Sequence, residues 1–274
     1  MPVRQTSAYA LRTYALSEAD QIVLFYTLDF GRLRSVANGA RRLKSRFGSA
    51  FQTLTRSSLS FFEREGQELT RVSACEVEQS YYDLLLTPEA AATAAYFAEL
   101  VQEFTAERDP NPAIFRLIGA VMEGVSEGVS LAVSARYFEV WMLRLSGVLP
   151  RLNECGGCGR GLSAERWVVP DPLEFICRQC RSAYGSSRWL SPGGTALLIE
   201  ILKKPPVEVM HGTGQNSQAV KRLAAVNRLL IRGQLDKELR TVRYLDRLRH
   251  AGRRRPPRGP HRVEIPHGTS GETQ

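Results

Sequence analysis

Two hydrophobic patterns divide the chain near residue 80. Before that point, short stretches rich in Thr, Val, Tyr, Phe and Leu are separated by turn residues such as Phe30-Gly31 and Glu65-Gly66-Gln67. Five strands in about 80 residues are typical of a small closed barrel, most often an OB-fold, with an SH3-like barrel as the main alternative. The pattern predicts these strands at Ala8–Leu16, Gln21–Leu28, Arg32–Ala37, Thr53–Arg64 and Glu68–Glu78.

From Thr87 onward the apolar residues recur at helical spacing. Thr87-Pro88-Glu89 places an N-cap residue, a first-turn proline and an acidic residue at the positive end of a helix. Asn111-Pro112 begins a second helix in the same way. Further helices are predicted at about Leu131–Leu145, after Ser191-Pro192 and, as a pair separated by Gly233, within Gln218–Arg249.

Four of the five cysteines form two CxxC pairs that are 18 residues apart, Cys155 with Cys158 and Cys177 with Cys180. Each pair fits one tight knuckle, and two pairs complete the tetrahedral thiolate shell of a structural zinc ion. Gly157 and Gly159 allow the backbone to turn sharply close to the sulfurs. The pattern predicts structural Zn²⁺, with no open position for water or substrate. Two disulfides or four unrelated core thiols are the alternatives.

The predicted elements give an α+β multidomain architecture. A five-stranded OB-fold barrel at 1–80 precedes a helical domain, whose two parts at 81–150 and 191–250 flank the inserted zinc module at 151–190. Residues 251–274 are rich in Arg and Pro without apolar periodicity, so we expect a disordered basic tail there. The fifth cysteine, Cys75, falls in a predicted strand and is expected to be inert core.

Charge changes this picture by indicating an anionic partner. The 274 residues carry a formal net charge of +9, and the sequence pI is about 9.6. Both ends are basic, whereas residues 81–150 carry four basic and nine acidic side chains. Such a distribution favours nucleic acid as a partner. The start of the chain lacks an apolar signal segment, and few cysteines lie outside the metal pattern, so we expect a cytoplasmic protein that does not enter membranes.

The strongest candidate for nucleic-acid binding is the stretch from Phe30 to Phe62, which has no acidic residue. Arg32 and Arg34 are two residues apart on a predicted strand and therefore point to one face. The other cations follow in a loop that also contains small residues. Phosphates are the expected ligands of such a surface. The candidates are Arg32, Arg34, Arg41, Arg42, Lys44 and Arg46, with Tyr14, Tyr26, Phe47, Phe51 and Phe61 as possible platforms for base stacking.

A second basic surface is predicted on the C-terminal helices. Its cations alternate with leucines that form the opposite, packed side, so it is either a solvated helix face or a surface for phosphates or an acidic peptide. The candidate residues are Arg228, Arg232, Arg240 and Arg243.

Sequence patterns of catalysis give little support for an enzyme. The chain contains no HExxH, GxGxxG or GxxxxGK[ST] sequence, and the HxE partner that a zinc deaminase needs is absent. We therefore interpret the chain as a binding protein. A zinc-ribbon and OB-fold factor for RNA binding or translation is the second hypothesis, and a metal-dependent nuclease is disfavoured because no cluster of Asp, Glu and His is evident.

In the order of these features the chain resembles RecO, the family of bacterial recombination mediators. The resemblance extends over about 5–250 and is carried by the segments 17–27, 31–42, 147–159 and 243–245. Only the cysteines are specific on their own. The family often has a glycine pair before the third cysteine, whereas this chain has Asp171-Pro172-Leu173-Glu174-Phe175-Ile176, and it extends beyond Arg253.

The resemblance implies a non-enzymatic role in DNA repair and recombination. Members of this family bind single- and double-stranded DNA, anneal complementary strands and pair with RecR. They engage the acidic tail of single-stranded-DNA-binding protein and help load the RecA recombinase at gaps, which implies a nucleoid-associated protein of the bacterial cytoplasm. Annealing without bond chemistry agrees with the basic surfaces, because neutralised phosphates allow two strands to approach each other.

Overall fold

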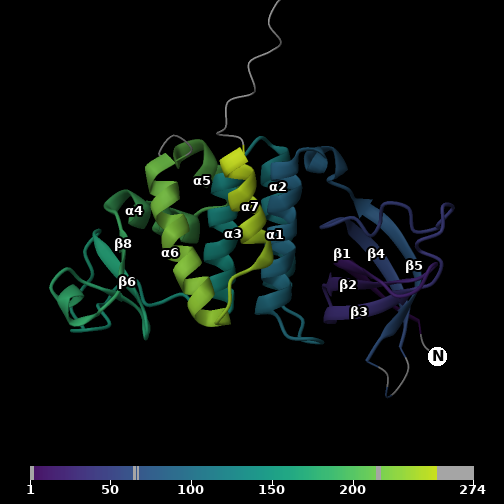
Figure 1. The fold of residues 1–274 in the computed structure, drawn as a ribbon, viewed down its shortest axis with the longest axis horizontal. Coiled ribbons are helices and arrows are strands. Elements are labelled where there is room, and N and C mark those ends of the chain that lie inside the picture. Colours follow the sequence, from purple (N-terminus) through teal and green to yellow (C-terminus); the bar gives the residue numbers. More distant parts are fainter. Residues whose placement is uncertain (1–2, 64–65, 67, 214–216, 252–274) are drawn as a thin grey trace, which may run out of the picture.

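The computed structural model describes residues 3–63, 66, 68–213 and 217–251, and the tail prediction for 251–274 falls almost wholly outside them. A bundle of helices occupies the centre of the molecule, with a barrel at one end and a small sheet at the other (Figure 1). Within the described residues, no helix is both long enough and apolar enough to cross a membrane.

Five strands form the closed N-terminal barrel, in the order β1-β2-β3-β5-β4. Strand β4 closes the barrel by pairing antiparallel with β1, and β3 pairs parallel with β5. This topology is the predicted OB-fold. The strands are β1 (Val3–Ala15), β2 (Gln21–Thr27), β3 (Gly31–Ala37), β4 (Arg56–Phe62) and β5 (Thr70–Gln79).

Two strands begin three or more residues away from the predicted start. Strand β1 begins at Val3 rather than Ala8, because its first residues pair with β4 across the closure. Strand β4 begins at Arg56 rather than Thr53. Leu54 there has a φ of 60°, and its N–H donates to the Ala10 carbonyl at 2.7 Å, which makes a turn rather than a strand.

The middle of strand β1 and most of strand β2 are buried on both faces. One face supplies the barrel core, through residues such as Ala8 and Phe25. The other packs against the helical bundle, where the Tyr9 ring centre lies 4.7 Å from that of Phe115. A side chain on Gly119 would begin 2.8 Å from the Tyr9 hydroxyl, so glycine allows this contact. The barrel is therefore held to the bundle by a continuous apolar core.

The helical domain begins with the 3-10 turn η1 (Tyr82–Leu86) and ends with α7. Thr87, Asn111, Ser130 and Ser191 cap the helices that follow them by accepting backbone hydrogen bonds, as predicted for three of the four. The helices are α1 (Pro88–Phe104), α2 (Pro112–Ser126), α3 (Leu131–Leu145), α4 (Pro192–Lys203), α5 (Pro206–Thr213), α6 (Ser217–Leu235) and α7 (Arg240–Ala251).

The predicted break at Gly233 is wrong. Gly233 lies inside α6, and the turn to α7 falls after Leu235, where Asp236 has a φ of 51°. A Cβ at position 233 would lie 2.8 Å from Leu173 Cδ2, so glycine there allows the cysteine module to approach α6 closely. Helix α5 was not predicted, since its eight residues are too few to show a period.

The cysteine module is built on a three-stranded sheet in the order β7-β6-β8. Val168 on one face joins the core of the helical bundle, and its neighbours Trp167 and Val169 on the other face pack with the cysteines. The strands are β6 (Arg166–Pro170), β7 (Leu173–Ile176) and β8 (Arg188–Leu190), and the short 3-10 turn η2 (Cys180–Ala183) contains the fourth cysteine.

Candidate nucleic-acid interface and metal centre

The fold brings the four predicted cysteines together. Their sulfurs all lie within 4.8 Å of one another, and the Sγ atoms of Cys158 and Cys177 are 3.9 Å apart. Four sulfurs around one zinc ion at about 2.3 Å are separated by about 3.8 Å. The cysteines can thus hold a tetrahedral metal ion. As thiols they form no disulfide, which removes that alternative.

Backbone hydrogen bonds shape the first knuckle and join it to the second. The Gly159 N–H donates to the Cys155 carbonyl at 2.8 Å, and the Cys177 N–H donates to the Cys155 sulfur at 3.2 Å. Gly159 has a φ of +69°, and a Cβ on Gly157 would lie 3.1 Å from the sulfur of Cys180. Both predicted glycine roles, the sharp turn and the close approach, are therefore confirmed.

Hydrogen bonds also favour thiolates at the first pair. Donation from the backbone and side chain of Arg160 lowers the pKa of Cys158 to about 6. The pKa of Cys180 is raised to about 12, chiefly through its hydrogen bond with Cys158. A dication bound among the four sulfurs would displace the protons that remain on them, because thiolates are the form that binds metal.

Arg166 holds the two ends of the first knuckle in place. Its guanidinium donates to the carbonyls of Leu152 at 2.8 Å and Ser163 at 2.7 Å, and only 3% of the residue is exposed. Burial lowers its pKa. A buried cation that bridges two loop carbonyls keeps the knuckle at a fixed position relative to β6. Sequence patterns did not single out this arginine, because its partners are backbone atoms.

Four predicted DNA contacts lie exposed on the loop between β3 and β4. Among the residues that the structure describes, none of the four forms an ion pair with a carboxylate. The loop is anchored by hydrogen bonds, such as that from the Arg41 N–H to the Ala19 carbonyl at 2.9 Å, and by buried Phe47. We call these residues the basic cluster: Arg41, Arg42, Lys44 and Arg46.

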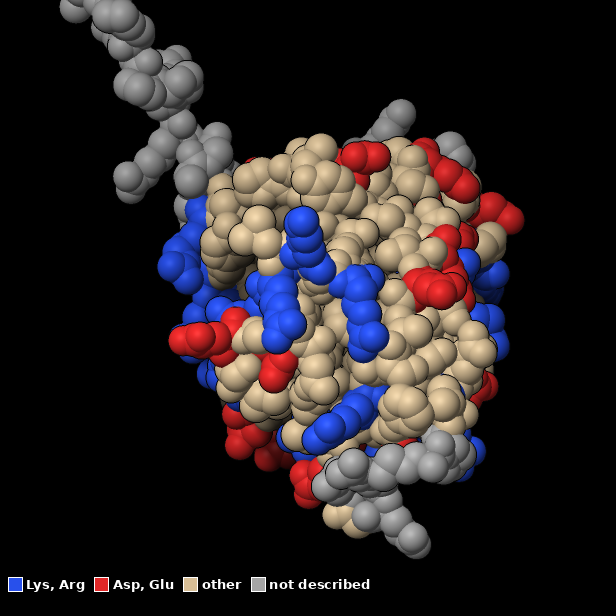
Figure 2. Space-filling model, turned by 90° about the vertical axis from the view of Figure 1, so that its right-hand side faces the viewer, with Lys and Arg blue, Asp and Glu red and all other residues tan. Residues whose placement is uncertain are grey.

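Figure 2 shows the barrel end of the molecule. Lys and Arg side chains are grouped in the middle of this face, and Asp and Glu lie mainly toward its edges. Because the carboxylates lie toward the edges, the middle of this face attracts the phosphates of a nucleic acid with little opposing repulsion.

The other two predicted contacts, Arg32 and Arg34, are half-buried and already engaged. The Arg32 guanidinium donates to the Gln102 carbonyl, which joins β3 to the end of α1. Arg34 pairs with Glu107 at 3.0 Å and with Glu68 at 3.3 Å. The segment from Phe30 to Phe62 contains no acidic residue, but the fold places Glu68 and Glu107 beside it.

Most of the proposed stacking aromatics belong to the core. Phe47, Phe61 and Tyr26 are at most 4% exposed, so no base can reach them in this conformation. Tyr14 is 38% exposed, with the Arg12 guanidinium 5.2 Å from its ring centre, and Phe51 is half-buried. The stacking prediction therefore remains only for Tyr14 and Phe51.

The second basic surface is more strongly paired than the basic cluster. Arg228 pairs with Asp246 at 3.1 Å, and Arg243 pairs with Glu238 at 3.1 Å. Arg232 and Arg240 are exposed, and neither guanidinium forms an ion pair with a carboxylate among the described residues. The four arginines do not form one uniform patch.

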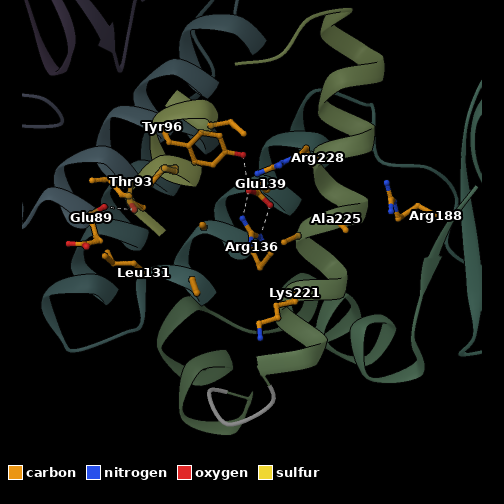
Figure 3. A pocket seen from close by; sticks show the side chains of 16 residues that line it. Glu89, Thr93, Tyr96, Leu131, Arg136, Glu139, Arg188, Lys221, Ala225 and Arg228 are labelled. Carbon is orange, nitrogen blue, oxygen red and sulfur yellow. Dashed lines mark hydrogen bonds and ion pairs between the residues drawn. The ribbon is translucent and has the colours of Figure 1, made fainter. Parts of the chain in front are cut away.

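A groove of about 530 Å³ lies between α6, α7 and the helices α1 and α3 (Figure 3). Its apolar lining includes Leu131 and Leu245, and its cations come from β8 and α6: Arg188, Lys221 and Arg228. We call it the helical groove.

A buried polar network forms the base of the helical groove (Figure 3). Glu139 accepts hydrogen bonds from Arg136 Nε at 2.7 Å, from Tyr96 at 2.8 Å and from Asn227 at 2.9 Å. Desolvation lowers the pKa of Arg136, but the adjacent Glu139 carboxylate raises it, and the net shift is upward. Burial raises the pKa of Tyr96. The network joins α1, α3 and α6.

The segment Gly124-Val125-Ser126-Glu127-Gly128 fits the catalytic pattern GxSxG, which the sequence-based prediction overlooked. In hydrolases this pattern places serine on a sharp strand-to-helix turn. Here Ser126 is the last residue of α2, and its hydroxyl donates to the Glu123 carbonyl at 2.6 Å. The structural context of a nucleophile is therefore missing.

An OB barrel with an exposed basic loop, joined to a helical bundle that carries a four-cysteine module, defines a class of proteins suited to nucleic acids. The family "Recombination protein O N terminal" matches residues 1–81, and "Recombination protein O C terminal" matches residues 85–243. The chain therefore belongs to the RecO family of DNA repair proteins.

Curated relatives agree with this assignment. A DNA repair protein RecO from Koribacter versatilis (strain Ellin345) is 31% identical over 249 residues, which cover 90% of this chain and 99% of that protein. The protein of the same name from Desulforudis audaxviator (strain MP104C) is 30% identical over 244 residues, which cover 89% and 96%. The family confirms the resemblance deduced from the sequence and a role in DNA repair and recombination.

Proposed function

We propose that the chain is a DNA-binding recombination mediator that binds single- and double-stranded DNA and anneals complementary strands. The observation that carries this proposal is the basic cluster, whose four cations are exposed on one anchored loop of an OB barrel. Cations in this position neutralise phosphates and release counterions, so two strands meet with less repulsion. This role needs no catalytic group.

The four cysteines are proposed to hold one structural zinc ion. Thiolate ligands favour Zn²⁺ over the hard cations, and sulfur occupies every tetrahedral position. When bound, the ion cross-links the two knuckles and stabilises the module. The module in turn packs on the helical bundle through Val168 and Leu173, so metal binding supports the bundle as well.

The helical groove is the proposed docking site for the acidic tail of single-stranded-DNA-binding protein. Arg188 and Lys221, which form no ion pair with a carboxylate among the described residues, suit the carboxylates of such a tail, and the leucines and alanines of the groove suit an apolar peptide end. Family membership further supports RecR as a partner and loading of RecA at gaps. Together these interactions place the protein on DNA that is coated with single-stranded-DNA-binding protein.

Strand annealing in the presence and absence of single-stranded-DNA-binding protein tests this function. The Arg41→Glu/Arg42→Glu variant should anneal slowly and bind both forms of DNA weakly. A matched control is Arg116→Glu/Arg151→Glu, which changes the net charge equally at exposed positions outside the barrel. If the control and the cluster variant behave alike, the barrel is not the main DNA surface.

Two further measurements separate the alternatives. Filter binding with DNA and RNA of equal length should favour DNA, and a strong preference for RNA would indicate an RNA-binding factor. Incubation of labelled DNA with the protein and Mg²⁺ should leave the DNA intact, whereas cleavage would indicate a nuclease.

A further inference from the structure

A cleft of about 380 Å³ opens where the barrel meets the helical bundle. Strand β1 and the loop between β3 and β4 form one side, and α1 and α7 form the other. Its lining includes the small residues Ala95 and Ala98 of α1 and two aromatic residues, Phe51 of the loop and Tyr244 of α7. Tyr244 is 47% exposed, so a ligand can reach its ring.

The cleft is cationic. Arg12 of β1 and Arg240 of α7 line it, and within the described part of the chain neither guanidinium pairs with a carboxylate. Glu99 is the one acidic residue among the described residues of the lining. Its carboxylate accepts hydrogen bonds from the backbone N–H groups of Arg240 and Thr241, both at 2.9 Å. The negative charge of Glu99 is thus balanced by the positive end of α7.

We propose that this cleft binds one unpaired nucleotide of single-stranded DNA. The base stacks on Tyr244, and Arg12 and Arg240 contact the flanking phosphates. Nucleic acid combines a flat aromatic ring with regular negative charge, which matches an exposed tyrosine between two cations. The two alanines of the lining are small and leave room for the ring. A duplex cannot enter in this way, because its bases are stacked and paired.

The cleft continues the basic cluster, and the inference therefore rests on the proposed DNA-binding function. Phe51 belongs to the same loop as the cluster, and its ring centre lies 4.8 Å from that of Phe47. The guanidinium of Arg46 lies in turn 4.9 Å from the centre of the Phe47 ring. A DNA strand that follows the loop from the basic cluster to the cleft meets no acidic side chain of the loop itself, because the segment 30–62 contains no acidic residue.

The test compares single-stranded and duplex DNA with the full-length protein and its Tyr244 variants. Tyr244→Ala should weaken binding of a single-stranded oligothymidylate about 5- to 150-fold, the range for one stacked base, and leave duplex binding unchanged. Tyr244→Phe keeps the ring and should bind like the parent. Tyr82→Ala removes a tyrosine that is 53% exposed outside the cleft and serves as the control.

A single 2-aminopurine in the oligonucleotide reports stacking directly. Its fluorescence should be quenched by the parent protein and by Tyr244→Phe, and less by Tyr244→Ala. Equal single-strand affinity and equal quenching for Tyr244→Ala and the parent would overturn the inference while leaving the proposed function intact. If the parent protein binds neither form of DNA, the proposed function fails as well.

Discussion

Arg34 Nε lies 3.0 Å from Glu107 Oε1, which joins the third barrel strand to the segment that follows α1. The same guanidinium contacts Glu68 at 3.3 Å. One cation of the barrel is therefore balanced by two carboxylates, whereas the basic cluster a few residues further along has no carboxylate partner among the described residues. Cations that look equivalent in the sequence are electrostatically different in the fold.

This difference predicts unequal effects of two alanine substitutions on DNA binding. Arg42→Ala should weaken binding and reduce the salt slope by about one counterion, because a free cation is lost. Arg34→Ala should change both quantities little, because its charge is already balanced within the protein. Titrations at several salt concentrations measure both, and equal slopes for the two variants would contradict the prediction.

Loss of one thiolate should release the metal and destabilise the cysteine module. Cys177→Ser removes a buried ligand whose N–H also bonds to Cys155, so the metal content should fall from about one per chain to near zero. Cys75→Ser changes a thiol of the barrel core and should keep the metal. Elemental analysis and thermal unfolding of both variants provide the measurement. Metal-free parent protein, purified without chelator, would refute the zinc proposal.

The buried pair in the helical bundle predicts a large cost for removing one partner. Glu139→Ala leaves the Arg136 guanidinium buried without its carboxylate and should lower the free energy of unfolding by about 3–5 kcal/mol. The double variant Arg136→Leu/Glu139→Leu should cost less, since no charge remains unpaired. Denaturant unfolding of both variants, with exposed Glu89→Ala as the control, decides whether the pair behaves in this way.

The sequence was sufficient for features that depend on neighbouring residues. The caps at Thr87 and Asn111, the helix Leu131–Leu145 and the cysteine spacing are all local signals, and the structure contains each of them. Strand β1 was truncated in the prediction because its first residues are fixed by pairing with β4, more than 50 positions away. Gly233 was wrongly predicted to break the helix. A glycine is required there because Leu173 approaches closely, and this tertiary contact leaves no local signal in the sequence.

The same limit applies to the candidate site. Local charge identified the basic cluster, but nothing near Arg34 in the sequence reveals Glu107, which lies in the segment after α1. Burial likewise separates Phe47 and Phe61 from Tyr14, although all three are aromatic residues among basic ones. The cleft at Tyr244 could not be predicted, because its α7 residues lie more than 180 positions from the barrel residues, up to Thr53, that share the lining.

Alkaline pH should destabilise the barrel through Cys75. Burial raises the pKa of this thiol from 9.0 to about 11, so the native state favours the neutral form. The unfolded chain loses this proton first as pH rises above 9, and the stability that the neutral thiol contributes is fully present below pH 9 and lost as pH rises through about 11. The loss should amount to about 1–3 kcal/mol over this range.

The measurement is the free energy of unfolding between pH 8 and pH 11 for the parent and for Cys75→Ala. The variant starts from a lower stability because of the small cavity, but its decline with pH should be shallower, since the thiol no longer titrates. Exposed Tyr82→Phe should decline like the parent. Parallel curves for the parent and Cys75→Ala would show that the thiol ionises as easily in the folded barrel as in the unfolded chain.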